Sequence, residues 1–136
     1  MDKTELEQKK AYLRSYRKAK AEAKSIQDSI DELRLNKMSP SMGGQDGMPR
    51  GSGSSDLSDY AARLDELERE LKAKQMRATI LMIEIESEIE NMDNATERTL
   101  LRYRYIRGYT WEKIAAELGY SWRQVHNIHR SALQNF

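Results

Sequence analysis

The stretch that decides the fold is residues 107–136, which read RGYTWEKIAAELGYSWRQVHNIHRSALQNF. It contains two short helical patterns separated by Gly119. Thr110 precedes the first pattern and Ser121 precedes the second, and both are residue types that cap helix N-termini. Gln124 stands three residues after Ser121 and completes a capping box. A short helix, a tight glycine turn and a second capped helix are the spacing of a helix-turn-helix motif.

A further helix upstream is expected to complete this domain, which we place at residues 93–136. Asn94 is a suitable N-cap for that helix, and Gly108 follows its last turn near Arg107. Its apolar positions would supply the missing wall of the core: Leu100, Leu101, Tyr105 and Ile106. The C-terminal domain is therefore predicted to consist of three helices.

One face of the last predicted helix, residues 122–134, carries side chains that suit base recognition. At about 100° per residue, its core stripe consists of Val125, Ile128 and Ala132, and His129 falls on the same side. On the opposite face, arginine can pair with guanine, and asparagine or glutamine can pair with adenine. Because the N-terminal end of such a helix enters the groove most deeply, the expected base-reading residues are Trp122, Arg123, Gln124, His126 and Asn127. The residues expected to contact phosphates are Arg102, Thr110, Lys113, Ser121 and Arg130.

Two long heptad patterns precede this domain and predict two long helices, in residues 1–36 and 57–92. The seam of the first is formed by Tyr16, Ala19, Ala23, Ile26, Ile30 and Leu33. The seam of the second is formed by Leu57, Tyr60, Leu64, Leu67, Leu71, Ala78, Leu81, Ile85 and Met92. Five of the seven glycines and both prolines fall in residues 37–56, which predicts a flexible Gly/Pro/Ser linker.

Each of these seams needs a partner helix, because an isolated helix gains little from exposing it. An antiparallel hairpin or coiled coil within the chain satisfies that need, and so does pairing with another chain. We favour the hairpin together with a homo-oligomeric contact, a dimer in the first instance. The reason is that further apolar residues widen the face of the second helix beyond one seam: Ile80, Met82, Ile83 and Ile89.

The composition excludes several classes of function. The 136 residues contain no cysteine, which removes disulfides, thiolate zinc sites and cysteine nucleophiles. His126 and His129 lie close in sequence but have no third ligand nearby, so no metal is expected. No catalytic constellation, phosphate-binding glycine loop or dinucleotide fingerprint is evident, and we expect neither an enzyme nor a cofactor. With no signal peptide and no apolar run near the roughly 20 residues of a membrane span, we expect no membrane contact and a cytoplasmic location.

The charge distribution supports a DNA contact near the C-terminus. The net charge is +1, but residues 93–136 hold seven basic and four acidic side chains, whereas residues 57–92 hold five and nine. The positive excess thus coincides with the helix-turn-helix pattern, as attraction to phosphate requires. A basic run, residues 9–24, holds seven Lys or Arg against one Glu. This run is either a solubilising helix face or an auxiliary contact with DNA or a partner.

The segment TERTLLRYRYIRGYTWEKIAAELGYSWRQVHNIHRSAL resembles region 4 of sigma-70-type factors, the domain that reads the −35 promoter element. It looks more similar still to phage-encoded regulators of this type, the RinA/ArpU-type late-transcription activators and their relatives. The resemblance implies binding to promoter DNA, with RNA polymerase as a partner. Sigma factors typically have arginine and glutamate where this chain has Trp122 and Arg123, so −35 specificity does not carry over. Asn127 matches a position where sigma factors use glutamine for a base contact, which implies a similar role here.

Together these patterns predict an all-α protein, with a long N-terminal helical hairpin or coiled coil followed by a three-helix, sigma region 4-like domain. The expected function is a sequence-specific, double-stranded-DNA-binding transcriptional regulator of phage or prophage genes in a bacterial host. An alternative is an oligomeric assembly adaptor, such as a small terminase-like packaging component, whose long helices build a ring. A third reading is a coiled-coil scaffold with a vestigial DNA-binding domain.

Overall fold

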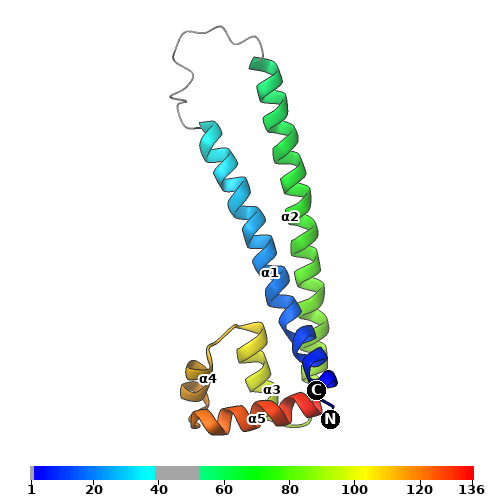
Figure 1. Cartoon of the computed structure of the whole chain (residues 1–136), viewed down its shortest axis with the longest axis vertical. Helices are drawn as coiled ribbons and strands as arrows, with labels where there is room; N and C mark the ends of the chain where they lie inside the picture. Colours follow the sequence, from blue (N-terminus) through cyan, green and yellow to red (C-terminus); the bar gives the residue numbers. More distant parts are fainter. Residues whose placement is uncertain (1, 39–52) are drawn as a thin grey trace. The chain divides into compact units, whose positions relative to one another are not determined.

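The computed structural model describes residues 2–38 and 53–136, and every regular element in these residues is a helix (Figure 1). The predicted all-α class is therefore confirmed. The elements are α1 (Lys3–Met38), α2 (Gly53–Glu90), α3 (Ala95–Leu101), the π-helix η2 (Arg102–Ile106), α4 (Trp111–Leu118) and α5 (Trp122–Asn135). The linker predicted over residues 37–56 falls largely on residues 39–52, which lie outside the described residues. The flanking residues 37–38 and 53–56 belong to α1 and α2.

The chain forms two compact units. The first contains Met1–Lys20 and Arg77–Phe136, and the second contains the described part of Ala21–Met76. No helix among the described residues has the length and apolar character needed to cross a membrane.

In the second unit, the end of α1 and the start of α2 run antiparallel. Lys74 Nζ lies 2.9 Å from Glu22 Oε2, while Arg34, further along α1, lies 3.4 Å from Glu68, which precedes Lys74 in α2. The buried apolar side chains of this unit are Ala23, Ile30 and Leu67, all of them predicted seam residues. Leu57 differs from the prediction, because 54% of its surface is exposed.

In the first unit, the remaining parts of α1 and α2 share one hydrophobic core with the C-terminal helices. Fully buried members of this core include Leu13 of α1, Ile85 and Ile89 of α2, Leu100 of α3 and Val125 of α5. Ile89 was expected to widen an apolar face toward another chain. This prediction was wrong, because the side chain of Ile89 is completely buried in the core of its own chain. The long helices therefore help to position the C-terminal helices in this unit.

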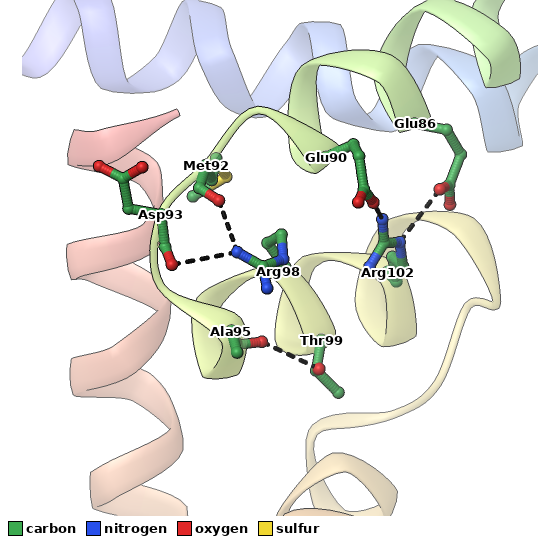
Figure 2. A network of polar contacts seen from close by, with 8 residues as sticks. All are labelled: Glu86, Glu90, Met92, Asp93, Ala95, Arg98, Thr99 and Arg102. Atoms are coloured by element: carbon green, nitrogen blue, oxygen red, sulfur yellow. Dashed lines mark hydrogen bonds and ion pairs between the residues drawn. The ribbon is translucent and has the colours of Figure 1, made fainter.

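The turn from α2 into α3 is held by backbone oxygens and one arginine (Figure 2). Arg98 Nη1 donates to the carbonyl oxygens of Met92 (2.6 Å) and Asp93 (3.1 Å). Asn94 is the N-cap of α3, as predicted, and its Oδ1 accepts from the backbone N–H of Glu97 at 2.9 Å. These bonds satisfy groups that a helix end and a tight turn would otherwise leave unpaired.

The helix predicted to continue to Arg107 instead widens into a π-helix at η2. The N–H of Arg107 donates to the carbonyl of Arg102, five residues earlier, at 2.9 Å. Gly108 then has a φ of 73°, a conformation that L side chains rarely adopt. A Cβ atom at this position would also collide with the guanidinium of Arg17 from α1. The backbone conformation therefore favours glycine at residue 108, and a side chain there would also displace the end of Arg17.

Candidate nucleic-acid interface

Capping interactions fix both helices of the predicted helix-turn-helix. Thr110 Oγ1 accepts from the N–H of Lys113 at 3.1 Å and starts α4. Gly119, with a φ of 72°, ends it in the left-handed conformation. Ser121 Oγ accepts from the N–H of Gln124 at 3.1 Å, while Gln124 Oε1 accepts from the N–H of Ser121 at 2.8 Å. The predicted caps, glycine turn and capping box are all present.

The buried side of α5 is held by apolar packing and by one carboxylate. Val125, Ala132 and Leu133 are almost completely buried. Glu97 of α3 is also buried, and its Oε2 accepts from Ser131 Oγ at 2.6 Å while its Oε1 accepts from Asn135 Nδ2 at 2.9 Å. Sequence reasoning missed Glu97, because an acidic residue in the first turn of a helix has an ordinary explanation in the helix dipole.

The opposite face of α5 is exposed, as the helical projection predicted. Arg123, Asn127 and Arg130 are all exposed, and Trp122 at the start of the helix exposes 59% of its surface. Gln124 is exposed as well, although its Oε1 is already used in the capping box. These side chains present guanidinium and amide groups on one side of a capped helix, which is the chemistry needed at base edges.

His126 has a different environment from the one expected. Its ring is half-buried and lies between two indoles, with its centroid 4.6 Å from that of Trp111 and 3.8 Å from that of Trp122. Its Nε2 is buried and has no hydrogen-bond partner within the described residues. This packing supports a role in holding Trp122 in place, so we do not retain His126 among the base-reading residues.

His129 faces the core, as predicted from the projection. Its Nε2 lies 2.7 Å from the hydroxyl of Tyr105, and the edge of the ring meets Trp111. Burial lowers the pKa of His129 to about 4, and the nearby positive charges of Lys10 and Arg104 act in the same direction. The imidazole is therefore neutral at neutral pH. In the described part of the chain, no group of three potential metal ligands is found.

Several cations surround the N-terminus of α4. Lys113 Nζ lies 4.3 Å from the centre of the Tyr109 ring, and the Arg104 guanidinium lies 4.3 Å from the centre of the Trp111 ring. Arg107 is exposed beside Tyr103. Sequence reasoning missed Arg104 and Arg107, because the π-helix changes the direction of the side chains around it. The sequence pattern that could have identified these two arginines is their alternation with the aromatic residues Tyr103, Tyr109 and Trp111.

Arg102, expected to contact phosphate, has acidic partners instead. Its Nε lies 3.0 Å from Glu86 and its Nη2 lies 2.5 Å from Glu90, both in the last turns of α2 (Figure 2). The hydrogen bond with Glu86 is the main cause that raises the pKa of Arg102 further. Because its guanidinium is committed to two carboxylates, we assign Arg102 to the attachment of η2 to α2 and not to DNA.

The C-terminal helices match a known protein family. Residues 94–135 match the family described as Sigma-70, region 4, and this range covers α3, η2, α4 and α5. These residues therefore form a sigma-70 region 4-like helix-turn-helix domain, a DNA-binding type of domain. The match does not extend to residues 1–93 or to Phe136. No curated protein and no solved structure matches the chain.

Proposed function

We propose that this protein is a sequence-specific DNA-binding transcriptional regulator that inserts α5 into the major groove. The observation that carries the proposal is the exposed face of α5, where Arg123 and Asn127 lie on a helix whose other side is fully committed to the core. The sigma-70 region 4 match of residues 94–135 supports DNA as the ligand.

In this proposal the first turns of α5 read the bases. Arg123 donates to a guanine and Asn127 pairs with an adenine, since these are the favoured partners of a guanidinium and of an amide. Gln124 still has its amide N–H groups available as donors, because only its Oε1 is used in the cap. Trp122 contributes an exposed aromatic surface at the entrance to the groove.

The phosphates are contacted by groups around the starts of α4 and α5. Lys113 and Arg130 are exposed cations. The hydroxyl oxygens of Thr110 and Ser121 accept backbone bonds and keep their hydrogens available for donation. Because both hydroxyls lie at helix N-termini, the helix dipoles favour an anion there. These contacts would set the register of the protein on the duplex.

The regulated genes are proposed to be those of a phage or prophage in the cytoplasm of a bacterial host. The support is the similarity of residues 96–133 to the phage-encoded region 4-like regulators. The same similarity supports RNA polymerase as a protein partner. A polymerase contact would make the protein an activator or a co-regulator at promoters that α5 selects.

The exposed face of α5 that carries Arg123 and Asn127, here called the reading face, can be tested by replacing Arg123. A binding site is first selected from a random duplex library, and affinities are then measured for that site and for random DNA. Arg123→Ala is expected to cost about 1–3 kcal/mol on the selected site and little on random DNA. Arg130→Ala serves as the matched control, since loss of a phosphate contact weakens both affinities to a similar extent. Equal losses on both duplexes for Arg123→Ala would remove its base-reading role.

An assembly adaptor, such as a small terminase-like packaging component, is the second candidate. The observation that favours it is a pair of exposed isoleucines on α2, Ile80 (45% exposed) and Ile83 (59% exposed), which suit contact with further copies. The mass of the protein in solution separates the two candidates. A monomer or a dimer supports the regulator, and a closed ring supports the adaptor.

A further inference from the structure

A second cationic site lies in the first unit, where α1 meets the turn before α4. A cavity of about 220 Å³ is lined there by Arg14 and Arg17 of α1, together with Arg104, Tyr105 and Gly108. No acidic residue lines it. Three guanidinium groups from two distant parts of the sequence thus open onto one small cavity.

The positions of these arginines are set by their neighbours. The guanidinium of Arg17 packs directly on Gly108, in the space that a Cβ atom would fill. Arg104 Nη1 donates to the carbonyl of Tyr109 at 3.0 Å, and its guanidinium stacks over Trp111. Two of the three guanidinium groups, those of Arg17 and Arg104, therefore have defined contacts beside the Gly108 turn, and less entropy is lost when a ligand binds to groups that are already held.

The charges of this site are not neutralised. Within residues 2–38 and 53–136, none of the three arginines has a carboxylate within ion-pair distance. Residues 9–20 carry six Lys or Arg and no acidic side chain. Arg102 differs from these three arginines, because it is held by two glutamates.

His129, near this cavity, is also surrounded by positive charges. After burial, the causes that lower the pKa of His129 are the charges of Lys10, His126, Arg104 and Arg14. An anion that entered the neighbouring cavity would relieve this repulsion.

Within this unit, α1 is attached to the DNA-binding domain. The start of α1 lies beside the end of α5 (Figure 1), where Lys9 Nζ donates to the carbonyl of Leu133 at 3.0 Å. The rings of Tyr12 and Phe136 also meet there, with centroids 6.2 Å apart. Leu13, one turn after Lys9, is completely buried in the shared core. The arginines of α1 therefore keep a fixed position relative to α5.

We propose that Arg14, Arg17 and Arg104 bind a backbone phosphate of the duplex whose major groove α5 enters. This inference rests on the proposed function. In helix-turn-helix complexes the first helix of the motif crosses the DNA backbone, and here Gly108 lies two residues before Thr110, the N-cap of that helix. The forked guanidinium matches the geometry of phosphate oxygens. The basic run of α1 thereby gains a role, as an extension of the DNA-binding surface beyond residues 94–135.

The salt dependence of binding to random DNA measures this contact, because phosphate contacts do not depend on sequence. Binding of the full chain to a random duplex of about 30 bp is followed by fluorescence anisotropy between about 50 and 250 mM KCl. Arg14→Gln/Arg17→Gln is expected to reduce the slope of log K against log salt by about 1 and to weaken binding several-fold. Lys18→Gln/Lys20→Gln is the matched control: it removes the same charge from exposed positions of α1 that do not line the cavity. Its slope should stay close to that of the wild type.

The outcomes separate the inference from the proposed function. If the wild-type protein binds no duplex, both fail. If it binds and Arg14→Gln/Arg17→Gln keeps the wild-type slope, only this inference is overturned, and the arginines then become a candidate surface for an acidic protein. If the slope of log K against log salt falls equally in the test and control variants, the arginines contribute only general electrostatic attraction to DNA. That result would overturn this inference too. Because Arg17 packs on Gly108, Arg14→Gln alone is measured as well; it leaves that contact intact and should show the same change at about half the size.

Discussion

At the scale of single residues, the two histidines of α5 have different environments although they lie only three positions apart. His126 lies between two indoles, with its ring tilted against both, at the edge of the reading face. His129 is buried against Tyr105, and its pKa is lowered from 6.5 to about 4 by burial and by neighbouring cations. The helical projection separated these two positions correctly. It could not show the aromatic neighbours Trp111 of α4 and Tyr105 of η2, which come from other helices.

The lowered pKa of His129 makes the stability of the protein depend on pH. Between pH 6.5 and 4 the unfolded chain binds a proton at this residue and the folded protein does not, so the free energy of unfolding falls as the pH decreases through this range. The expected loss is about 2 kcal/mol between pH 7.5 and pH 5. Urea unfolding at a series of pH values measures it.

Two variants test whether His129 causes this loss. His129→Gln should remove most of the pH dependence, although the protein is less stable at neutral pH. His126→Gln leaves the buried imidazole in place and should keep the dependence. If His129→Gln loses stability toward pH 5 as steeply as the wild type, another group is responsible.

The residues of the candidate site were partly predictable. Helical periodicity placed Arg123, Asn127 and Arg130 on the exposed face, because that face depends only on local geometry. The acidic partners of Arg102 could not be predicted, because Glu86 and Glu90 lie in another helix and no local pattern reveals them. The same limit applies to Arg17, whose position depends on Gly108.

At the scale of the elements, the orientation of α5 depends on its attachment to α3. Glu97 connects the two, since its carboxylate accepts hydrogen bonds from Ser131 and Asn135 of α5. Charge-assisted bonds to a buried carboxylate are strong, and removing the carboxylate leaves two polar groups without a partner. The reading face on the other side of α5 is positioned by this connection.

Glu97→Ala is therefore expected to destabilise the protein by about 3 kcal/mol, measured by urea unfolding at neutral pH. Glu97→Gln keeps one oxygen acceptor and should cost clearly less. Glu117→Ala, which removes an exposed carboxylate from α4, is the control and should change stability little. A Glu97→Ala protein as stable as the control variant would show that the connection is not important.

The elements themselves could be predicted well where caps and periodicity agree. Asn94, Thr110 and Ser121 cap the helices they were expected to cap, since capping is decided by a few adjacent residues. The π-helix at η2 could not be predicted. Its residues form an acceptable α-helix in isolation, and the wider turn appears where the chain must satisfy the core and the Gly108 turn together.

At the scale of the whole molecule, α2 has exposed apolar residues, and a contact between copies through them stays a prediction. Ile80 and Ile83 lie on one side of α2, while Ile85 and Ile89 are buried in the core of the same chain. Exposed isoleucines on adjacent turns favour association. A regulator that binds as a dimer can also use two half-sites, which raises the affinity for DNA through effective concentration.

Ile80→Glu/Ile83→Glu is expected to convert a dimer into a monomer and to weaken binding to a two-half-site duplex by about tenfold or more. Sedimentation equilibrium measures the mass, and the affinity for a single half-site should stay unchanged. Thr79→Glu, at an exposed polar position beside Ile80, is the control. An unchanged mass for the isoleucine variant would contradict a dimer through this face.

The widened turn of η2 also determines where the DNA-binding domain can be cut for transplantation into another protein. A π-turn contains one residue more than the α-turn it replaces. A chimaera that fused residues 107–136 to a regular helix would therefore rotate the graft by about 100° at the junction. The Gly108 turn would then meet a different side of the host helix, and α4 and α5 would lose the wall formed by Leu100 and Leu101. A functional graft has to begin before Asn94, so that the irregular turn travels with the helices it orients.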